Sequence, residues 1–306
     1  MKYVEAGGAR LSAVGLGTWQ FGSMEWGYGR RYADVDSIAI VRRALELGIN
    51  LIDTAEIYGQ GRSEKIVGEA IRDRRDQVFL ATKLFPIGLP VQVAARARAS
   101  ARRLGTSRLD LYQPHWPSPL FPLRYTMPRF KRLVDEGLVK HIGVSNFSLK
   151  GWQDAEQAAR MPVLTNQVRF SLVHRAPDSD LVPWAQKNGR VVIAYSPLAQ
   201  GLLSGRYQDR PPSNFRRFRG DFRAGSRARL APLIEALKAI GFAHQATPAQ
   251  VALAWLIAKP NVVVIPGASS VRQVEENAAA AGIDLTAEEV DRLTRLTGVA
   301  PKAPAG

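Results

Sequence analysis

Short apolar runs alternate with longer amphipathic segments along almost the whole chain. Eight of the runs are rich in β-branched and aliphatic residues and have the length of strands: residues 14–16, 50–53, 78–83, 109–113, 141–144, 164–167, 191–195 and 262–265. Apolar positions recur with the period of a helix in residues 35–47, 64–72, 91–104, 123–136, 149–160, 180–187, 230–242 and 271–280. This alternation predicts an α/β protein built from repeated strand–helix units.

Two of the predicted strands, 191–195 and 262–265, are apolar at almost every position rather than at alternate ones. Such strands are buried on both faces, which is typical of a parallel sheet covered by helices. Eight units predict a closed (β/α)8 TIM barrel, and residues 1–306 are expected to form one domain because no linker interrupts them. A doubly wound open sheet is the alternative, but no G-x-G-x-x-G sequence follows a strand, and Gly15-x-Gly17 is common in ordinary turns.

Three features fall outside the eight units. Residues 2–4 and 10–12 flank Gly7-Gly8 and predict a short N-terminal hairpin that closes the lower end of the barrel. Residues 248–258 and 287–296 predict accessory helices. Residues 206–229, after the seventh strand, predict one long irregular loop, and long loops in compact domains are often functional.

Local chemistry predicts where several helices begin and end. Side chains that can accept a backbone N–H stand at three predicted starts: Asp34 or Asp36, Ser63 and Ser148. Glycines, which tolerate positive φ, stand at four predicted ends: Gly48, Gly137, Gly189 and Gly241.

Composition narrows the class of protein. The 306 residues are 46% hydrophobic and 23% charged, which excludes a disordered or fibrous chain. The absence of cysteine excludes a disulfide scaffold, a cysteine-ligated zinc site, an iron–sulfur cluster and a catalytic thiol. No apolar run reaches the about 20 residues that span a bilayer, and the first residues lack the apolar core of a signal peptide, so we expect a soluble cytoplasmic protein without a membrane partner.

The chain is strongly basic, with 42 Lys and Arg against 27 Asp and Glu and a net charge of +15. Such a charge favours anionic partners. Residues 206–229 are the extreme, with eight arginines and two aspartates. Because no aromatic-interleaved basic platform or nucleic-acid motif accompanies the charge, we expect no nucleic-acid partner, and a phosphorylated cofactor becomes the leading alternative. The pattern indicates no particular oligomeric state.

In an eight-fold barrel the reactive side chains project from the carboxyl ends of the strands, which open onto one face. Asp53 ends the second predicted strand, Lys83 ends the third and His115 follows the fourth, at spacings of 30 and 32 positions. Each spacing is about one strand–helix unit, so these residues should meet at one mouth together with Tyr58. The other strand ends bring Gly17, Thr18, Trp19, Trp116, Ser145, Asn146, Gln167, Tyr195, Ser196, Pro197, Gly267 and Ser269 to the same face.

An aspartate, a lysine, a tyrosine and a histidine in one pocket suit the reduction of a carbonyl. A buried Lys83 needs a carboxylate partner, and Asp53 is the nearest candidate. We expect this pair to lower the pKa of Tyr58 below its usual value of about 10, so that the phenol can protonate a carbonyl oxygen. His115 can hydrogen-bond the same oxygen. The matching hydride must come from a nicotinamide, because no side chain supplies one.

Each of these residues also has a purely structural interpretation. Asp53 and Tyr58 could serve a turn, Lys83 could reach solvent, and His115 could be a satisfied core histidine. Their convergence on consecutive strand ends favours the site. A metal site is not expected, because the four histidines show no H-x-x-x-H spacing, and the chain has no G-x-S-x-G sequence for a serine nucleophile.

The motifs at these positions resemble the aldo-keto reductase superfamily. They are Asp53-Thr54-Ala55-x-x-Tyr58-Gly59, Ala81-Thr82-Lys83, His115-Trp116, Gly143-Val144-Ser145-Asn146-Phe147 and Ile265-Pro266-Gly267-Ala268-Ser269, and the resemblance runs from about residue 10 to residue 296. It implies a (β/α)8 enzyme that reduces aldehydes or ketones with NAD(P)H and without a metal. It also implies a catalytic tetrad of Asp53, Tyr58, Lys83 and His115, with Tyr58 as the acid.

The same resemblance assigns residues to the cofactor. Ser145, Asn146 and Gln167 match positions that hold the nicotinamide amide, and Tyr195 matches the aromatic stacked on its ring. The pyrophosphate loop corresponds to Ser196, Pro197, Leu198, Ala199, Gly201, Ser204 and Arg206, and the adenosine end to Gly267, Ser269, Gln273, Glu276 and Asn277. We also expect Gly17, Thr18, Trp19 and Asp53 to line the cofactor. Gly267-Ala268-Ser269 resembles the variant in bacterial and channel-β-subunit-like relatives; NADPH is expected, with Ser269, Arg272 and Arg216 near its phosphates, and NADH remains an alternative.

The expected substrate is a small aldehyde or ketone with an apolar or aromatic body. The aromatic residues near the mouth suggest this, and the candidate contacts are Trp19, Phe21, Tyr58, Phe85, His115 and Trp116. Two other functions stay open: a nucleotide-sensing regulatory subunit, and a barrel aldolase or isomerase that uses Lys83 as a Schiff-base nucleophile. The basic loop 206–229 is interpreted either as a lid over the pyrophosphate or as a solvated segment.

Overall fold

The computed structural model describes residues 1–29, 32–208, 211–212, 215–218 and 220–297. Within these residues, parallel strands pair in chain order: β3 (Leu16–Gly17), β4 (Leu51–Asp53), β5 (Phe79–Leu84), β6 (Leu109–Pro114), β7 (Val139–Ser145), β8 (Thr165–Arg169), β9 (Val191–Tyr195) and β10 (Val262–Ile265). The last strand meets the first through two parallel bridges, Val14 with Val264 and Gly17 with Gly267. The predicted (β/α)8 barrel is therefore confirmed.

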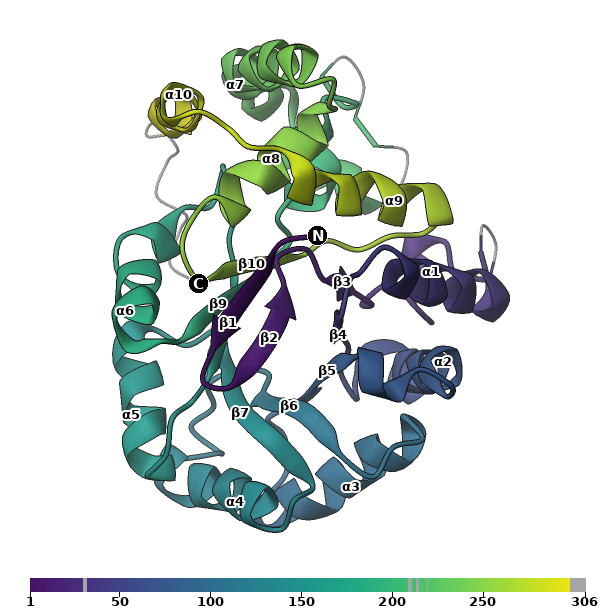
Figure 1. Cartoon of the computed structure of the whole chain (residues 1–306), viewed down its shortest axis with the longest axis vertical. Helices are drawn as coiled ribbons and strands as arrows, with labels where there is room; N and C mark the ends of the chain where they lie inside the picture. Colours follow the sequence, from purple (N-terminus) through teal and green to yellow (C-terminus); the bar gives the residue numbers. More distant parts are fainter. Residues whose placement is uncertain (30–31, 209–210, 213–214, 219, 298–306) are drawn as a thin grey trace.

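The helices form a ring around these strands (Figure 1). They are α1 (Asp34–Glu46), α2 (Arg62–Ile71), α3 (Val93–Arg103), α4 (Leu123–Asp135), α5 (Leu149–Ala159), α6 (Leu181–Asn188), α7 (Ala224–Ala243), α8 (Pro248–Ile257), α9 (Val271–Ala279) and α10 (Ala287–Thr297). Short 3-10 helices lie in the connections: η1 (Met24–Trp26), η2 (Tyr58–Gly61), η3 (Arg75–Gln77), η4 (Pro90–Gln92), η5 (Ala176–Asp178), η6 (Ala199–Ser204), η7 (Phe215–Phe218), η8 (Gly220–Phe222) and η9 (Ala280–Gly282). The expected accessory helices are α8 and α10. No helix in the part of the chain that the structure describes is long and apolar enough to cross a membrane.

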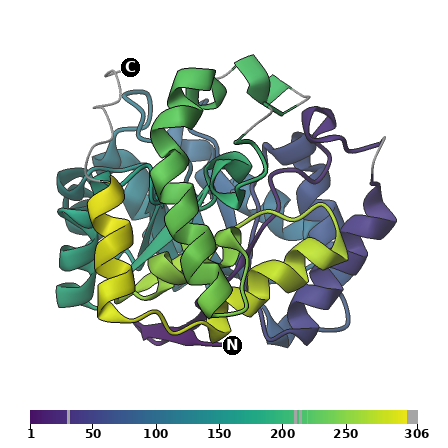
Figure 2. The same cartoon turned by 90° about the horizontal axis from the view of Figure 1, so that it is seen from above.

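Two hydrophobic cores hold the barrel. The larger one lies between the strands and the helices. The smaller one fills the barrel lumen with Leu51, Phe79, Leu111, Ile193 and Val263 and continues into the hairpin through Leu11. That hairpin pairs β1 (Tyr3–Ala6) with β2 (Ala9–Ser12), as predicted, and lies at the end of the barrel opposite the turns that precede α7 (Figure 2). The hairpin thus closes this end of the barrel with packed apolar side chains.

The predicted helix ends are only partly right. Ser148 caps α5 by accepting the N–H of Gly151, as expected. The first helix begins after Ala33, so Asp34 and Asp36 lie inside its first turn rather than before it. Asp36 nevertheless accepts a backbone N–H, that of Ala33 at 2.8 Å, and both carboxylates interact favourably with the positive end of the helix dipole. Ser63 lies inside α2 and caps nothing, because its hydroxyl is used in a buried network described below.

Glycines follow the same mixed pattern. Gly48, Gly137 and Gly189 have positive φ just after α1, α4 and α6, as predicted. Gly241 lies inside α7, which contradicts its expected place at a helix end. A Cβ at Gly241 would lie 2.4 Å from the carbonyl oxygen of Ala246, so the position requires glycine for a close backbone approach rather than for a turn.

The long loop after β9 is more ordered than the sequence predicts. Its described part includes η7 and η8, and α7 begins already at Ala224. Phe222 is buried, with its ring edge-on to that of Tyr207 at 5.6 Å. The guanidinium of Arg227 donates to the carbonyl oxygens of Tyr207 and Gln208, each at 3.0 Å. An aromatic anchor and a bridging arginine therefore fasten the loop to itself and to the barrel.

Candidate active site

Four polar side chains meet at the carboxyl ends of β4, β5 and β6. Asp53 ends β4, Lys83 is the fifth residue of β5, His115 follows β6, and Tyr58 begins η2 after β4. Lys83 follows Phe79 and Ala81 in the alternation of β5, and both of these face the lumen core. The same alternation that fills the barrel with apolar side chains therefore directs the ammonium of Lys83 into its upper end.

The ammonium of Lys83 has three partners. Its Nζ lies 2.6 Å from Asp53 Oδ2, 2.9 Å from the carbonyl oxygen of Thr54 and 3.3 Å from the hydroxyl of Tyr58. The Lys83 side chain has no exposed surface, and that of Asp53 is 2% exposed. The sequence-predicted pair is thus formed, and it presents its positive end to the phenol.

His115 completes the group from the other side. Its ring meets the ring of Tyr58 edge-on at a centroid distance of 5.7 Å and that of Phe85 at 6.0 Å. Its Nδ1 is buried and has no hydrogen-bond partner among the described residues. Burial, followed by the nearby charge of Lys83, lowers the pKa of His115 to about 3, so the imidazole is neutral at physiological pH.

Burial changes the expected acidity of the phenol. Loss of hydration raises the pKa of Tyr58, and this effect outweighs the lowering effect of Lys83, while Asp53 raises it further. The expectation of a lowered pKa is therefore wrong for the protein without ligand. For Lys83, burial by itself would lower the pKa, but Asp53 and Tyr58 outweigh this effect, so its pKa is raised and the ammonium keeps its charge.

A second layer of hydrogen bonds joins the next three strand ends to the tetrad. Gln167 donates from Nε2 to Asp53 Oδ1 at 2.7 Å, so both carboxylate oxygens of Asp53 are occupied. Asn146 donates to the carbonyl oxygen of His115 at 3.0 Å and accepts from the hydroxyl of Tyr195 at 2.9 Å. Ser145 donates to the carbonyl oxygen of Gln167. The structure thus brings together every residue that the sequence assigned to the nicotinamide end.

A buried hydroxyl cluster, which the sequence did not suggest, supports the first two loops. Ser63 Oγ lies 2.8 Å from Thr18 Oγ1 and 2.9 Å from Thr54 Oγ1, and Thr18 donates to the carbonyl oxygen of Asp53. All three hydroxyls are buried. Small polar residues are common in loops, so the sequence carries no sign that these three meet.

Left-handed backbone also concentrates at the mouth. Asn146, Ser196, Ala199 and Gln200 all have positive φ, between 48° and 64°. Such conformations cost energy for residues other than glycine and persist at sites where the surroundings hold them. They lie directly after β7 and β9, at the positions that resemblance assigned to the cofactor.

Comparison with known proteins identifies the family of the chain. The Aldo/keto reductase family model matches residues 13–297. This chain belongs to the aldo/keto reductase family. An uncharacterized oxidoreductase of Mycobacterium tuberculosis is 51% identical to it over 297 residues, which cover 96% of this chain and 92% of that protein. The methylglyoxal reductase YeaE of Escherichia coli is 36% identical over 295 residues, with 95% and 92% covered. The chain is therefore an oxidoreductase of this family.

Solved structures agree with the fold of this aldo/keto reductase. A Klebsiella pneumoniae aldo/keto reductase in complex with NADP and acetate has a TM-score of 0.78 and 34% identity, and the match covers 99% of this chain and 97% of that one. A glycerol dehydrogenase of Gluconobacter oxydans has a TM-score of 0.87 and 29% identity, with 99% and 98% covered.

The far end of the predicted cofactor site lies at the start of α9. Gln273 Oε1 accepts from the backbone N–H of Ser269 at 2.8 Å and from its hydroxyl at 3.1 Å. Arg272, the only basic residue of the turn, is paired with Glu276 at 2.8 Å. Asn277 is buried and donates to the carbonyl oxygen of Gly267. These side chains are thus assembled but engaged with one another in this aldo/keto reductase.

The turn after β9 contains the other predicted cofactor residues. Pro197 and Ala199 are buried, Leu198 and Gly201 are half-buried, and Ser204 donates to the carbonyl oxygen of Gly201 at 2.7 Å. Arg206 is exposed. Arg216 reaches back from the long loop, donates to the hydroxyl of Tyr207 at 3.1 Å, and lies over the rings of Tyr207 and Trp26. This arginine therefore joins the loops after β3 and β9.

The predicted substrate contacts divide into two groups. Trp19 and Trp116 are 42% and 45% exposed, and Phe85 is half-buried beside His115. Phe21 is fully buried in the core between strands and helices. This placement corrects the expectation for Phe21, whose apolar side chain serves packing and offers no surface to a substrate.

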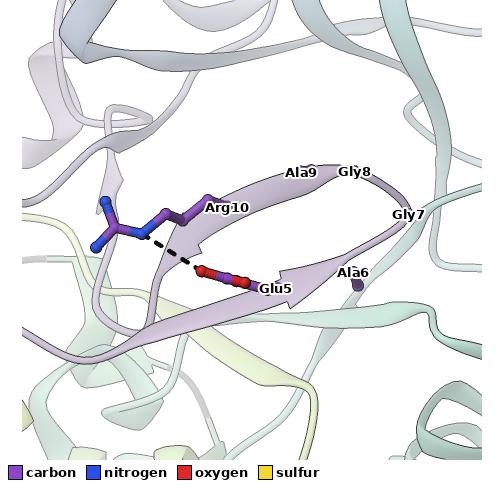
Figure 3. Close-up of a pocket in the computed structure, with 6 residues that line it drawn as sticks. All are labelled: Glu5, Ala6, Gly7, Gly8, Ala9 and Arg10. Atoms are coloured by element: carbon purple, nitrogen blue, oxygen red, sulfur yellow. Dashed lines mark ion pairs between the residues drawn. The ribbon is translucent and has the colours of Figure 1, made fainter.

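A shallow pocket of about 440 Å³ lies at the opposite end of the molecule, lined by hairpin residues 5–10 (Figure 3). Its charged groups, Glu5 and Arg10, are exposed and lie 3.7 Å apart. Apart from these two side chains, the pocket is lined by the glycines and alanines of the hairpin. Among the described residues, no three His, Asp or Glu side chains gather as metal ligands.

Proposed function

We propose that this protein reduces aldehydes or ketones to alcohols with NADPH and that Tyr58 is the proton donor. The observation that carries the proposal is the contact of 3.3 Å between the ammonium of Lys83 and the hydroxyl of Tyr58, next to a neutral His115. A reduction needs a protonated acid at neutral pH, and the raised pKa of Tyr58 keeps the phenol protonated there.

The mouth of the barrel fits a phosphorylated dinucleotide. Gln200 Oε1 is buried without a hydrogen-bond partner among the described residues, in a turn whose backbone is left-handed. A Cβ at Gly267 would lie 2.5 Å from Oε1 of Gln20, whose Nε2 donates to the carbonyl oxygen of Ala268, so glycine lets this side chain lie against the backbone of the turn. Two Klebsiella pneumoniae structures, in complex with NADP and with NADPH, support the choice of cofactor by analogy.

The residues that would hold the cofactor follow the strand ends. Ser145, Asn146, Gln167 and Tyr195 would bind the nicotinamide end, with Gly17, Thr18 and Trp19 beside it. Ser196 to Ala199, Gly201, Ser204, Arg206 and Arg216 would bind the pyrophosphate, and Gly267, Ser269, Arg272, Gln273, Glu276 and Asn277 the adenosine end. The chemistry that NADPH supplies when bound is a hydride.

The protein's own residues handle the proton. Tyr58 donates its hydroxyl proton to the carbonyl oxygen, and the ammonium of Lys83 stabilises the phenolate that remains. Asp53 and Thr54 hold that ammonium in place. His115 is neutral and can donate a hydrogen bond to the carbonyl oxygen from its Nε2, which orients the carbonyl without competing for the proton.

Three finer assignments belong to the same proposal. NADPH is preferred over NADH because Arg272, paired only with the half-buried Glu276, could turn to a 2′-phosphate. Gly267-Ala268-Ser269 resembles the same stretch in channel-β-subunit-like relatives, which supports assigning the chain to that branch. The substrate would be a carbonyl with an apolar or aromatic body, bounded by Trp19, Phe85 and Trp116; YeaE, by its name, acts on the small carbonyl methylglyoxal.

The decisive experiment compares wild type with Tyr58→Phe in NADPH oxidation with a panel of aldehydes. We expect at least a ~100-fold loss of kcat, because the variant lacks the acid, with an unchanged Kd for NADPH. Equal rates in the two proteins would reject the role of Tyr58. A wild type that binds NADPH but oxidises it with none of the aldehydes would favour a nucleotide-sensing regulatory subunit. Borohydride trapping should find no substrate adduct on Lys83, since its charged ammonium is a poor nucleophile.

A further inference from the structure

A second ion pair, which is half-buried, lies just outside the tetrad and joins α3 to the loop after β4. Arg96 of α3 donates from Nε to Glu56 Oε2 at 3.2 Å and from Nη2 to Glu56 Oε1. The two side chains are only 21% and 13% exposed. The proposed mechanism uses neither residue, although Glu56 stands two positions before Tyr58.

The pair binds the backbone of the next loop rather than another side chain. Glu56 Oε1 accepts the N–H of Phe85 at 2.6 Å, and Arg96 donates to the carbonyl oxygens of Phe85 and Ile87, each at 2.7 Å. Phe85 follows the last residue of β5. Both of its backbone groups are therefore held by this ion pair at the point where the sheet stops holding them.

The same carboxylate is built into the turn that carries Tyr58. The N–H of Glu56 points at the carbonyl oxygen of Lys83 at 3.4 Å, and the N–H of Tyr58 donates to the carbonyl oxygen of Ala55 at 3.0 Å. Glu56 lies inside the turn from Ala55 to Tyr58. One side chain thus connects the backbone of Tyr58 to the backbone of Phe85.

These two residues flank His115, whose ring also stacks on that of Trp116. The His115 ring meets Tyr58 at an interplanar angle of 74° and Phe85 at 89°. Because Nδ1 has no hydrogen-bond partner among the described residues, ring contacts and the backbone orient the imidazole. A shift of Phe85 or of the Tyr58 turn would therefore move the donor that faces the substrate.

We propose that Arg96 and Glu56 are positioning residues for the reaction: they hold Tyr58 and Phe85 on either side of His115 and so fix the two groups that contact the carbonyl oxygen. The inference rests on the proposed function, because the geometry that the pair maintains is that of carbonyl reduction. A displacement of about 1 Å at such groups can cost as much as a hundredfold in rate.

The chain offers a matched control at the other end of β5. Arg75 and Asp110 are 24% and 10% exposed and also form a salt bridge, at 2.6 Å. Arg75 donates to the carbonyl oxygen of Val78 at 2.9 Å, and Asp110 accepts the N–H of Leu80 at 3.0 Å. This pair holds the start of β5 as Arg96 and Glu56 hold the segment after its end, but it lies far from the tetrad along the strand.

The test compares Arg96→Met and Arg75→Met with wild type, using NADPH with benzaldehyde and with methylglyoxal. For Arg96→Met we expect kcat/KM to fall about 10- to 100-fold, the Kd for NADPH to stay within twofold, and the amide of Phe85 to exchange its hydrogen faster. For Arg75→Met we expect a lower Tm with kcat/KM within about threefold of wild type. Glu56→Gln keeps a hydrogen-bond acceptor for the N–H of Phe85 and a similar side-chain volume, so it replaces Arg96→Met in the test if that variant does not fold. In the double variant, the two losses of kcat/KM should not add, because the two residues act as a unit.

Three results would overturn the inference. Arg96→Met could keep its kcat/KM although the Phe85 amide exchanges faster, or the losses in Arg96→Met and Arg75→Met could be equal, which would make the pair merely structural. The losses of kcat/KM caused by Arg96→Met and Glu56→Gln could also prove additive in the double variant. A wild type that oxidises no NADPH with any carbonyl would instead overturn the proposed function itself.

Discussion

The ammonium of Lys83 has no exposed surface, yet it keeps its charge because Asp53 Oδ2 lies 2.6 Å away. Spacing in the sequence was enough to predict this partnership, since both residues end neighbouring strands. It was not enough to predict the direction in which the pKa of Tyr58 moves, because that depends on how much water the folded loops exclude. Phe21 illustrates the same gap: its position near a strand end says nothing about which way its ring points.

The depressed pKa of His115 predicts a pH effect on stability. In the folded protein this pKa is about 3, below the 6.5 of an unfolded chain, so between these values the unfolded state binds one more proton. His115 therefore contributes stability above about pH 6.5 that is lost as the pH falls towards 3. We expect the free energy of unfolding of wild type to fall by up to about 1.4 kcal/mol per pH unit more than that of His115→Gln in this window. Parallel curves from urea unfolding of the two proteins would contradict it.

At the scale of elements, the strands were predicted closely because most are short runs rich in β-branched and aliphatic residues, and several of them end in a polar residue. Helix ends were predicted less well. The signs at Ser63 and Gly241 were interpreted from their nearest neighbours in sequence, whereas Ser63 bonds to Thr18 and Thr54 of other segments, and Gly241 meets Ala246 beyond the helix. Contacts of this kind leave no periodic trace in a single sequence.

Gly241 gives a test of this explanation. Alanine is normally favoured over glycine inside a helix by about 1 kcal/mol, but a Cβ at Gly241 would lie 2.4 Å from a backbone oxygen. We expect Gly241→Ala to lower the free energy of unfolding by about 1–3 kcal/mol. At Gly225, in the same helix, an added Cβ would meet nothing within 4 Å, so Gly225→Ala should be neutral or slightly stabilising. Thermal unfolding of both variants measures the difference; a stabilised Gly241→Ala would refute the close-contact account.

The basic loop after β9 gives a second test at this scale. Arg216 already lies over Trp26 and Tyr207, and we interpret the loop as a lid that orders further when the pyrophosphate binds. Trypsin should therefore cleave at Arg206, Arg223 and their neighbours more slowly in the presence of saturating NADPH. Cleavage at an unchanged rate, with Arg10 in the remote hairpin as the internal reference, would leave the loop a solvated segment.

For the whole molecule, the eight strand–helix units were sufficient to predict the barrel, and separate patterns outside those units predicted the hairpin and the accessory helices. The two ends of that barrel differ in kind. The hairpin end is closed by apolar packing through Leu11, and the hairpin's own charged pair, Glu5 and Arg10, is exposed. The opposite end collects the tetrad, the left-handed turns and the arginines of the long loop.

The net charge of +15 predicts how the cofactor binds. A basic field attracts phosphates, and salt screens it with a Debye length of about 10 Å at 0.1 M. We expect the Kd for NADPH, measured by quenching of tryptophan fluorescence, to rise several-fold between about 0.05 and 0.3 M salt. The Kd for NADH should rise less, because it carries no 2′-phosphate. Equal salt dependence for the two nucleotides would argue against a contact with Arg272.

The hairpin determines by which end of the barrel ligands can enter and leave. In the part of the chain that the structure describes, β1 and β2 close the lower end of the barrel with apolar packing, so ligands must reach Lys83 through the opposite end. Whichever of two ligands lies deeper must then enter first and leave last. The closed lower end of the barrel therefore imposes an order on binding and release, independently of any loop movement.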